Sequence, residues 1–181
     1  MFTTDLAITR NCDADAVFAV YPFTPQQAIS DAIIKASCIP VFCGVRGGTT
    51  KGLRTVSPAK DVESQRAMGV VLNAPIFDLN LLAVSKAVDI PVIVTVTKED
   101  TDIRARLEAG ASVLNIACGH RTCDAVRKIR ADYPRVPLIA SGGNTEETVL
   151  DTIRSGANAI TYTPPSVQNM FKQLMATYRE K

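Results

Sequence analysis

The chain has 181 residues, 46% of them hydrophobic, which is enough to bury one full core and predicts a single globular domain over residues 1–181. Its 20 basic and 18 acidic residues are scattered and leave a formal charge of +2, so we expect no nucleic-acid partner, although a local basic patch stays open. No apolar run approaches the roughly 18 residues that span a membrane. The first residues lack the basic region followed by an apolar region that is typical of a signal peptide, so we expect a cytoplasmic protein with no membrane partner.

Short apolar runs, introduced alternately by proline and by glycine, divide the chain. Residues 1–12 are expected to form a helix across the lower end of the fold, and the strand 14–22 is followed by the helix 25–37. Proline is tolerated at the first residue of a strand, and glycine after a helix takes the left-handed conformation that ends it. Further strands are therefore predicted at 39–45, 69–75, 90–96, 110–118, 136–142 and 156–163. Apolar residues three and four apart predict helices at 78–88, 99–109, 122–133, 145–155 and 166–178.

Strands that alternate with helices at this spacing predict a parallel sheet covered by helices, in the α/β class. An open doubly wound sheet and a closed barrel both fit, and the repeat of about 45 residues favours the barrel. Because a barrel of eight strands takes about 250 residues, we expect a compact TIM-like β/α barrel of seven parallel strands with an N-terminal helix. The alternative of eight strands stays open. A missing strand would leave two exposed sheet edges, which predicts a homo-oligomer.

The five cysteines are odd in number and include no CxxC pair, so we expect reduced thiols rather than disulfides. Cys38 and Cys43 are expected to pack in the core. The sequence indicates no metal site and no cofactor.

Polar residues recur near the predicted carboxyl ends of the strands. Alternate side chains of a strand share a face, and barrel enzymes keep their sites at the carboxyl ends of the strands. We therefore expect a substrate-binding mouth formed by Asn73, Thr95, Asn115 and Thr161. The alternative is that these residues only end their strands through local backbone hydrogen bonds.

A glycine turn follows the predicted strand 136–142. Amides without side chains beside a helix start bind anions, and the last two turns of a barrel frequently hold phosphate. The predicted phosphate site comprises Ser141, Gly142, Gly143, Asn144, Thr163 and Ser166. Pro164 and Pro165 weaken this hypothesis because they have no N–H to donate. The alternative is a glycine turn that serves packing alone.

Three further residues are candidates for catalysis. Lys98 follows a strand and could act as an amine, and Cys118 and His120 could form a nucleophile and its base. For Lys98 the alternative is a solvated helix start. His120 and Arg121 could instead contact a ligand, and Arg46, with Lys51 and Arg54 in a long basic loop, could close over an anion. The alternative for that loop is a disordered segment or an oligomer contact.

The runs "GVVLNAP", "IPVIVTV", "GASVLNIA" and "IASGGNTEE" resemble the keto-deoxy-phosphogluconate aldolase family from Gly69 to Ser166. The plan of seven strands behind an N-terminal helix is similar to the glycerol-uptake operon antiterminator regulator family. Both resemblances imply a barrel that holds a phosphorylated small molecule. The aldolase resemblance also implies a Schiff-base lysine, but this sequence has Asn115 there, and its first matched strand has no carboxylate. An amide cannot form an imine.

These patterns predict a protein that binds a phosphorylated small metabolite at the mouth of the barrel and converts it as a lyase or an isomerase. The alternative is a non-catalytic sensor or regulator that binds such a metabolite and signals to a partner. A deep pocket around Lys98 or His120 would favour the enzyme, whereas a basic surface patch would favour the regulator.

Overall fold

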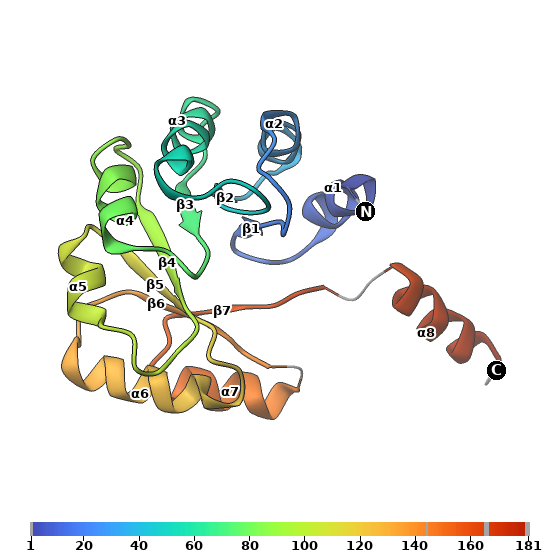
Figure 1. Cartoon of the computed structure of the whole chain (residues 1–181). Helices are drawn as coiled ribbons and strands as arrows, with labels where there is room; N and C mark the ends of the chain where they lie inside the picture. The colour runs from blue at the N-terminus through green and yellow to red at the C-terminus, as the bar shows by residue number, and fades with distance from the viewer. Residues whose placement is uncertain (1, 144, 165–166, 180–181) are drawn as a thin grey trace.

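A computed structural model describes residues 2–143, 145–164 and 167–179 of the chain. Its sheet has seven parallel strands, and each strand pairs with the next one along the chain. The strands are β1 (Val17–Ala19), β2 (Val41–Gly44), β3 (Gly69–Leu72), β4 (Val92–Val96), β5 (Val113–Ile116), β6 (Leu138–Ser141) and β7 (Ala159–Thr161). Figure 1 shows this sheet curling into a nearly closed barrel. The TIM-like fold expected from the sequence is confirmed, and the open doubly wound sheet is not what forms.

Helices alternate with the strands, and those that precede the last strand cover the outside of the barrel (Figure 1). They are α1 (Phe2–Asn11), α2 (Gln27–Ala36), α3 (Val56–Ser64), α4 (Asp78–Ser85), α5 (Ile103–Glu108), α6 (Thr122–Asp132), α7 (Glu146–Arg154) and α8 (Val167–Arg179), with short 3₁₀ helices η1 (Gly52–Thr55) and η2 (Gly119–Arg121). The amphipathic pattern explains their placement. In α6, for example, Ala125, Val126 and Ile129 are buried against the sheet, and these positions lie on one side of a helix.

Helix α1 lies along the side of the barrel, next to α2, and the expected position across the lower end is wrong (Figure 1). Polar anchors near both of its ends hold it there. The Tyr21 hydroxyl donates to Asp5 Oδ2 at 2.8 Å, and Arg10 donates to the carbonyl oxygen of Ala36 at 3.3 Å. Tyr21 follows the carboxyl-terminal end of β1, at the mouth of the barrel. Ala36 ends α2 at the opposite end of the barrel, so α1 runs beside α2 from one end of the barrel to the other.

The two faces of the sheet have different environments. Val70 and Leu72 of β3 belong to the core layer between the sheet and the helices, whereas Val71 and Ile93 are equally buried but lie outside that layer. Because alternate side chains of a strand point to opposite faces, Val71 and Ile93 point into the barrel. The same alternation directs three polar residues into the barrel near its mouth: Asn73, Thr95 and Asn115.

The barrel has an open side. Along the described residues, β1 and β7 each pair with one strand only and not with each other. Beyond β7, helix α8 stands away from the barrel (Figure 1). None of the helices in the described ranges is long and apolar enough to cross a membrane.

All five cysteines are free thiols, and only one of the two predicted core positions is correct. Cys43 is 1% exposed, but Cys38 is exposed because it lies in the turn between α2 and β2.

Candidate functional site

Three polar side chains form a hydrogen-bonded chain across β3, β4 and β5. Asn115 Nδ2 donates to Thr95 Oγ1 at 3.2 Å, and Thr95 Oγ1 donates to Asn73 Oδ1 at 3.4 Å. All three side chains are half-buried. This polar chain lies above the apolar barrel interior formed by residues such as Val71 and Ile93, so the barrel changes from apolar to polar at its mouth.

The polar chain ends on an atom that has no partner. Asn115 Oδ1 is buried and, among the described side chains, forms no hydrogen bond. A buried oxygen left in this way costs about 1–3 kcal/mol of folding free energy. Unsatisfied polar groups of this kind are uncommon in folded proteins and require an explanation, such as a water or a ligand that supplies the donor.

A second polar pair continues around the mouth on β6 and β7. Ser141 Oγ and Thr161 Oγ1 lie 3.4 Å apart, and Thr161 Oγ1 also donates to the carbonyl oxygen of Ala140 at 3.4 Å. With the polar chain, these hydroxyls line the mouth of the barrel with neutral donors and acceptors.

A basic cleft opens beside the polar chain, above the ends of β2 and β3. It has a volume of about 500 Å³, part of it open to solvent, and its lining residues are Tyr21, Pro22, Arg46, Gly47, Gly48, Thr50, Lys51, Asn73 and Ala74. Arg46 donates to the carbonyl oxygen of Asn73 at 3.3 Å, which joins the cleft to the polar chain. The structure therefore brings Arg46 and Lys51 together with Asn73.

The loop that carries Arg46 and Lys51 is tied to the loop after β1. Gly48 N donates to the carbonyl oxygen of Pro22 at 3.0 Å, and the hydroxyls of Thr24 and Thr49 lie 3.1 Å apart. A side chain at Gly47 would collide with the carbonyl oxygen of Phe23. These contacts hold the middle of the loop that carries both cations, while Arg54 lies in η1, outside the lining of the cleft.

The glycine turn after β6 packs against the first turn of α7. Gly142 N donates to the carbonyl oxygen of Thr161 at 3.5 Å, and Gly143, with φ 78°, packs against the side chain of Thr148. Thr145 and Thr148 form a reciprocal capping box, which occupies the amides of both residues.

Acidic residues also lie at this helix start. Glu146 and Glu147 occupy the first turn of α7, where they already interact with the positive end of the helix dipole. Thr163 is exposed, and Asn144 and Ser166 lie outside the described residues. The described groups at this turn therefore include two carboxylates, whereas the lining of the basic cleft includes two cations.

The catalytic candidates lie on the rim and do not form a cluster. Lys98 and His120 are exposed, and Arg121 is paired with Glu99 at 2.9 Å. Burial, with a smaller contribution from Glu99, raises the pKa of the Cys118 thiol. Its Sγ donates to the carbonyl oxygen of Val96 at 3.7 Å. An activated cysteine nucleophile has a lowered pKa, so the environment of Cys118 does not favour a thiolate.

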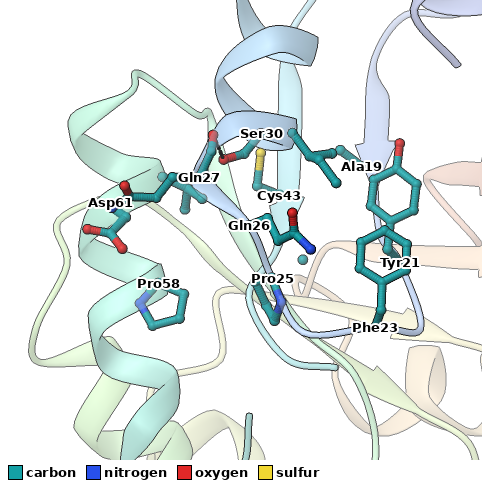
Figure 2. A pocket seen from close by; sticks show the side chains of 13 residues that line it. Ala19, Tyr21, Phe23, Pro25, Gln26, Gln27, Ser30, Cys43, Pro58 and Asp61 are labelled. Carbon is teal, nitrogen blue, oxygen red and sulfur yellow. Dashed lines mark hydrogen bonds between the residues drawn. The ribbon is translucent and has the colours of Figure 1, made fainter. Parts of the chain in front are cut away.

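A different cavity, which the sequence analysis missed, lies between β1 and β2 and the helices α2 and α3 (Figure 2). It has a volume of about 540 Å³, part of it open to solvent, and its polar lining comes from Tyr21, Gln26, Gln27, Ser30, Cys43 and Asp61. Burial raises the pKa of the Cys43 thiol to about 12. Burial and the neighbouring Asp5 also raise the pKa of Tyr21. Apart from the position of Tyr21 just after a strand, no sequence motif marks this cavity.

Among the described residues, no group of three or more histidine, cysteine, aspartate or glutamate side chains could hold a metal ion.

No family model matches this sequence. Among curated proteins the chain is similar to inosine-5'-monophosphate dehydrogenase from Staphylococcus aureus (strain Mu50 / ATCC 700699), with 34% identity over 122 residues. The match covers 64% of this chain and 22% of the dehydrogenase, so the chain spans about a fifth of the length of the curated relatives that it matches.

Solved structures with the same fold cover most of the chain. A putative phosphonomutase from Burkholderia cenocepacia J2315 superposes with a TM-score of 0.67 and 15% identity over 99% of both chains. Phosphoenolpyruvate phosphomutase from Streptomyces platensis subsp. rosaceus gives a TM-score of 0.69 and 11% identity, covering 98% of this chain and 86% of the mutase. A putative dihydrodipicolinate synthetase from Pseudomonas aeruginosa gives a TM-score of 0.68 and 17% identity, covering 88% of this chain and 61% of the synthetase. At these identities the likeness establishes the TIM-barrel fold, and the two family resemblances of the sequence analysis stay predictions.

Proposed function

We propose that this protein binds a phosphorylated small metabolite at the mouth of its barrel and converts it in a lyase-type or isomerase-type reaction. The observation that carries the proposal is the joining of the basic cleft to the polar chain. Arg46 and Lys51 supply two positive charges, and Asn73 belongs to both the cleft and the chain. A ligand with an anionic end and a neutral polar body fits this arrangement.

The names of similar proteins support a phosphorylated ligand. The partial relative is a dehydrogenase of inosine-5'-monophosphate, and one structural neighbour is a phosphomutase of phosphoenolpyruvate. Of the two candidate anion sites, we favour the basic cleft over the glycine turn. The arginine fork forms two parallel hydrogen bonds to a phosphate, whereas the turn is flanked by Glu146 and Glu147.

The chemistry at this mouth would combine neutral hydrogen bonds with proton transfer from the rim. Asn115 and Thr95 would orient substrate oxygens, because amides and hydroxyls donate and accept hydrogen bonds but do not form imines. The described inward positions near the mouth hold no lysine and no carboxylate, so proton transfer would fall to Lys98 or His120. The names of neighbouring proteins, which include 2,3-dimethylmalate lyase, agree with a lyase or an isomerase.

The proposal is tested first by binding. Titration calorimetry with a panel of sugar phosphates and phosphorylated acids should identify a ligand, and Arg46→Gln should weaken its binding by roughly 10-fold to 100-fold, the value of a charge-assisted contact. Arg54→Gln is the matched control, because Arg54 is exposed and lies outside the cleft. If the two variants bind alike, the basic cleft is not the site.

Conversion is tested second, by following each bound compound in NMR spectra. A product that disappears with Lys98→Met or His120→Gln, while binding is retained, would support the enzyme and identify its proton-transfer group.

One observation favours a second candidate, a non-catalytic sensor of the same metabolite. The three side chains of the polar chain are themselves neutral, and the pKa of Cys118 is raised rather than lowered. A ligand that binds without any product forming, and that changes the assembly of the protein or its affinity for another protein, would favour the sensor.

A further inference from the structure

Helix α8 has an apolar face that is exposed. Phe171 is 63% exposed and Tyr178 82%, and Met175 between them is also exposed. Residues spaced by four and three positions lie on one face of a helix. Figure 1 shows this helix standing away from the barrel. A row of large apolar side chains in water is typical of a surface that contacts another protein.

The connection to β7 directs α8 away from its own barrel. Strand β7 ends at Thr161, and the residues up to Pro164 continue without helix or turn. Proline at 164 and 165 confines the residue before each of them to extended conformations. Residues 162–164 therefore leave the barrel without turning back along it, and Figure 1 shows α8 apart from α7.

Helix α7 has an exposed apolar surface of its own. Leu150 is 41% exposed and Ile153 48%, and their spacing of three positions puts them on one face. In a closed barrel the next helix would cover this face. Here α7 lies between β6 and β7, and the next helix, α8, stands away from it (Figure 1).

The charges of the two helices are complementary. The exposed surface of α7 carries Glu146, Glu147 and Asp151, and among the described residues only Asp151 has a close basic partner, Arg154 at 3.5 Å. The described residues of α8 include Lys172 and Arg179 and no acidic residue. Pairing the apolar faces would bring these opposite charges together, which favours this partner over others.

Another exposed apolar patch is a poorer partner for α8. Leu53, Phe77 and Leu79 are all exposed near η1 and the start of α4. The nearby basic residues Lys51 and Arg54 would repel the basic helix α8. Like charges across an interface disfavour the wrong partner.

From these features we infer that α8 of one chain docks on α7 of a second copy of the same chain, so that two copies exchange their last helices. The arrangement is symmetric, because each copy supplies one α8 and one α7. It would cover both apolar faces and lie beside the open side of the barrel.

The test measures the mass of the full chain by light scattering after size exclusion. One chain has a mass of 19.4 kDa, and the parent should elute with twice that mass. Phe171→Glu and Leu150→Glu should each raise the dimer dissociation constant at least about 30-fold, the effect of losing a central contact. Ala176→Glu on another side of α8, and Phe77→Glu in the other patch, should leave the dimer intact. Unchanged far-UV circular dichroism would show that each variant is folded.

Mixing variants separates exchange between chains from packing within one chain. A dimer of Phe171→Glu with Leu150→Glu keeps one undamaged α8–α7 contact, so the mixture should contain more dimer than either variant alone. If the parent is a monomer at about 100 µM, roughly a hundred times the dissociation constant of a micromolar complex, the inference is wrong. It is also wrong if Phe77→Glu separates the dimer and Leu150→Glu does not.

Discussion

Replacing Asn115 by leucine should leave the folded protein as stable as before or stabilise it, although the change removes a hydrogen bond. Asn115 Oδ1 is buried without a partner among the described residues, which costs about 1–3 kcal/mol, while the bond from Nδ2 to Thr95 contributes about 1 kcal/mol. Leucine branches at the same atom, and the half-buried position leaves room at the mouth. The free energy of unfolding should therefore rise by about 0–2 kcal/mol.

Urea unfolding followed by circular dichroism measures this difference, and the slope of the transition should not change. Thr161→Val provides a contrast, because the hydroxyl of Thr161 has two contacts at 3.4 Å, and its loss should lower stability by about 0.5–1.5 kcal/mol. A loss of more than about 1 kcal/mol in Asn115→Leu would refute the reasoning and imply that the oxygen has a partner, such as a bound water. If the proposed function is correct, the same variant should bind the metabolite more weakly than the parent.

Three other predictions concern different parts of the chain. Arg130 donates to the carbonyl oxygens of Gly156, Pro134 and Val136 and to Asn158 Oδ1. Arg130→Ala should therefore lower the free energy of unfolding by roughly 3–5 kcal/mol in urea titrations. Arg127→Ala, which breaks an exposed ion pair, should change it by less than about 1 kcal/mol. Burial raises the pKa of Cys43 from 9.0 to about 12, so the thiol ionises in the unfolded chain at a lower pH than in the folded protein. The free energy of unfolding should therefore fall as pH rises from about 9 to about 12. A Cys43→Ala variant with the same pH profile would contradict this. Borohydride reduction with pyruvate should trap no adduct on any lysine by mass spectrometry, and an adduct on Lys98 would return the protein to Schiff-base chemistry.

The order of strands and helices could be predicted because it depends on local signals. Proline and glycine mark where helices stop and strands begin, and the period of the apolar residues separates the two kinds of element. These signals also put Asn73, Thr95 and Asn115 at equivalent positions of successive strands, and in the structure the three lie side by side, while their role in binding stays a prediction.

Other features depend on contacts that the repeat does not encode. The side-on position of α1 is set by Asp5 meeting Tyr21, and no periodicity indicates that pairing. The sequence indicates Asn144 or Thr145 as the cap of α7, but not the reciprocal bond from Thr148, because threonine stands there in place of the usual glutamate of a capping box. Whether Asn115 Oδ1 has a hydrogen-bond partner depends on distances of a few tenths of an ångström, and composition and spacing do not specify these distances.

The sequential strand order has a consequence for how the protein folds. Every one of the six pairings joins a strand to its immediate successor, so no contact between strands has to wait for a distant part of the chain. Each pairing closes a loop of one β-α unit, for example from Val17 to Val41, and the entropy cost of closing a loop rises only slowly with its length. Because β1 and β7 do not pair in the described residues, no final step has to join the first unit to the last. The first β-α units can therefore assemble while the ribosome is still synthesising the later ones, and the sheet can grow one strand at a time.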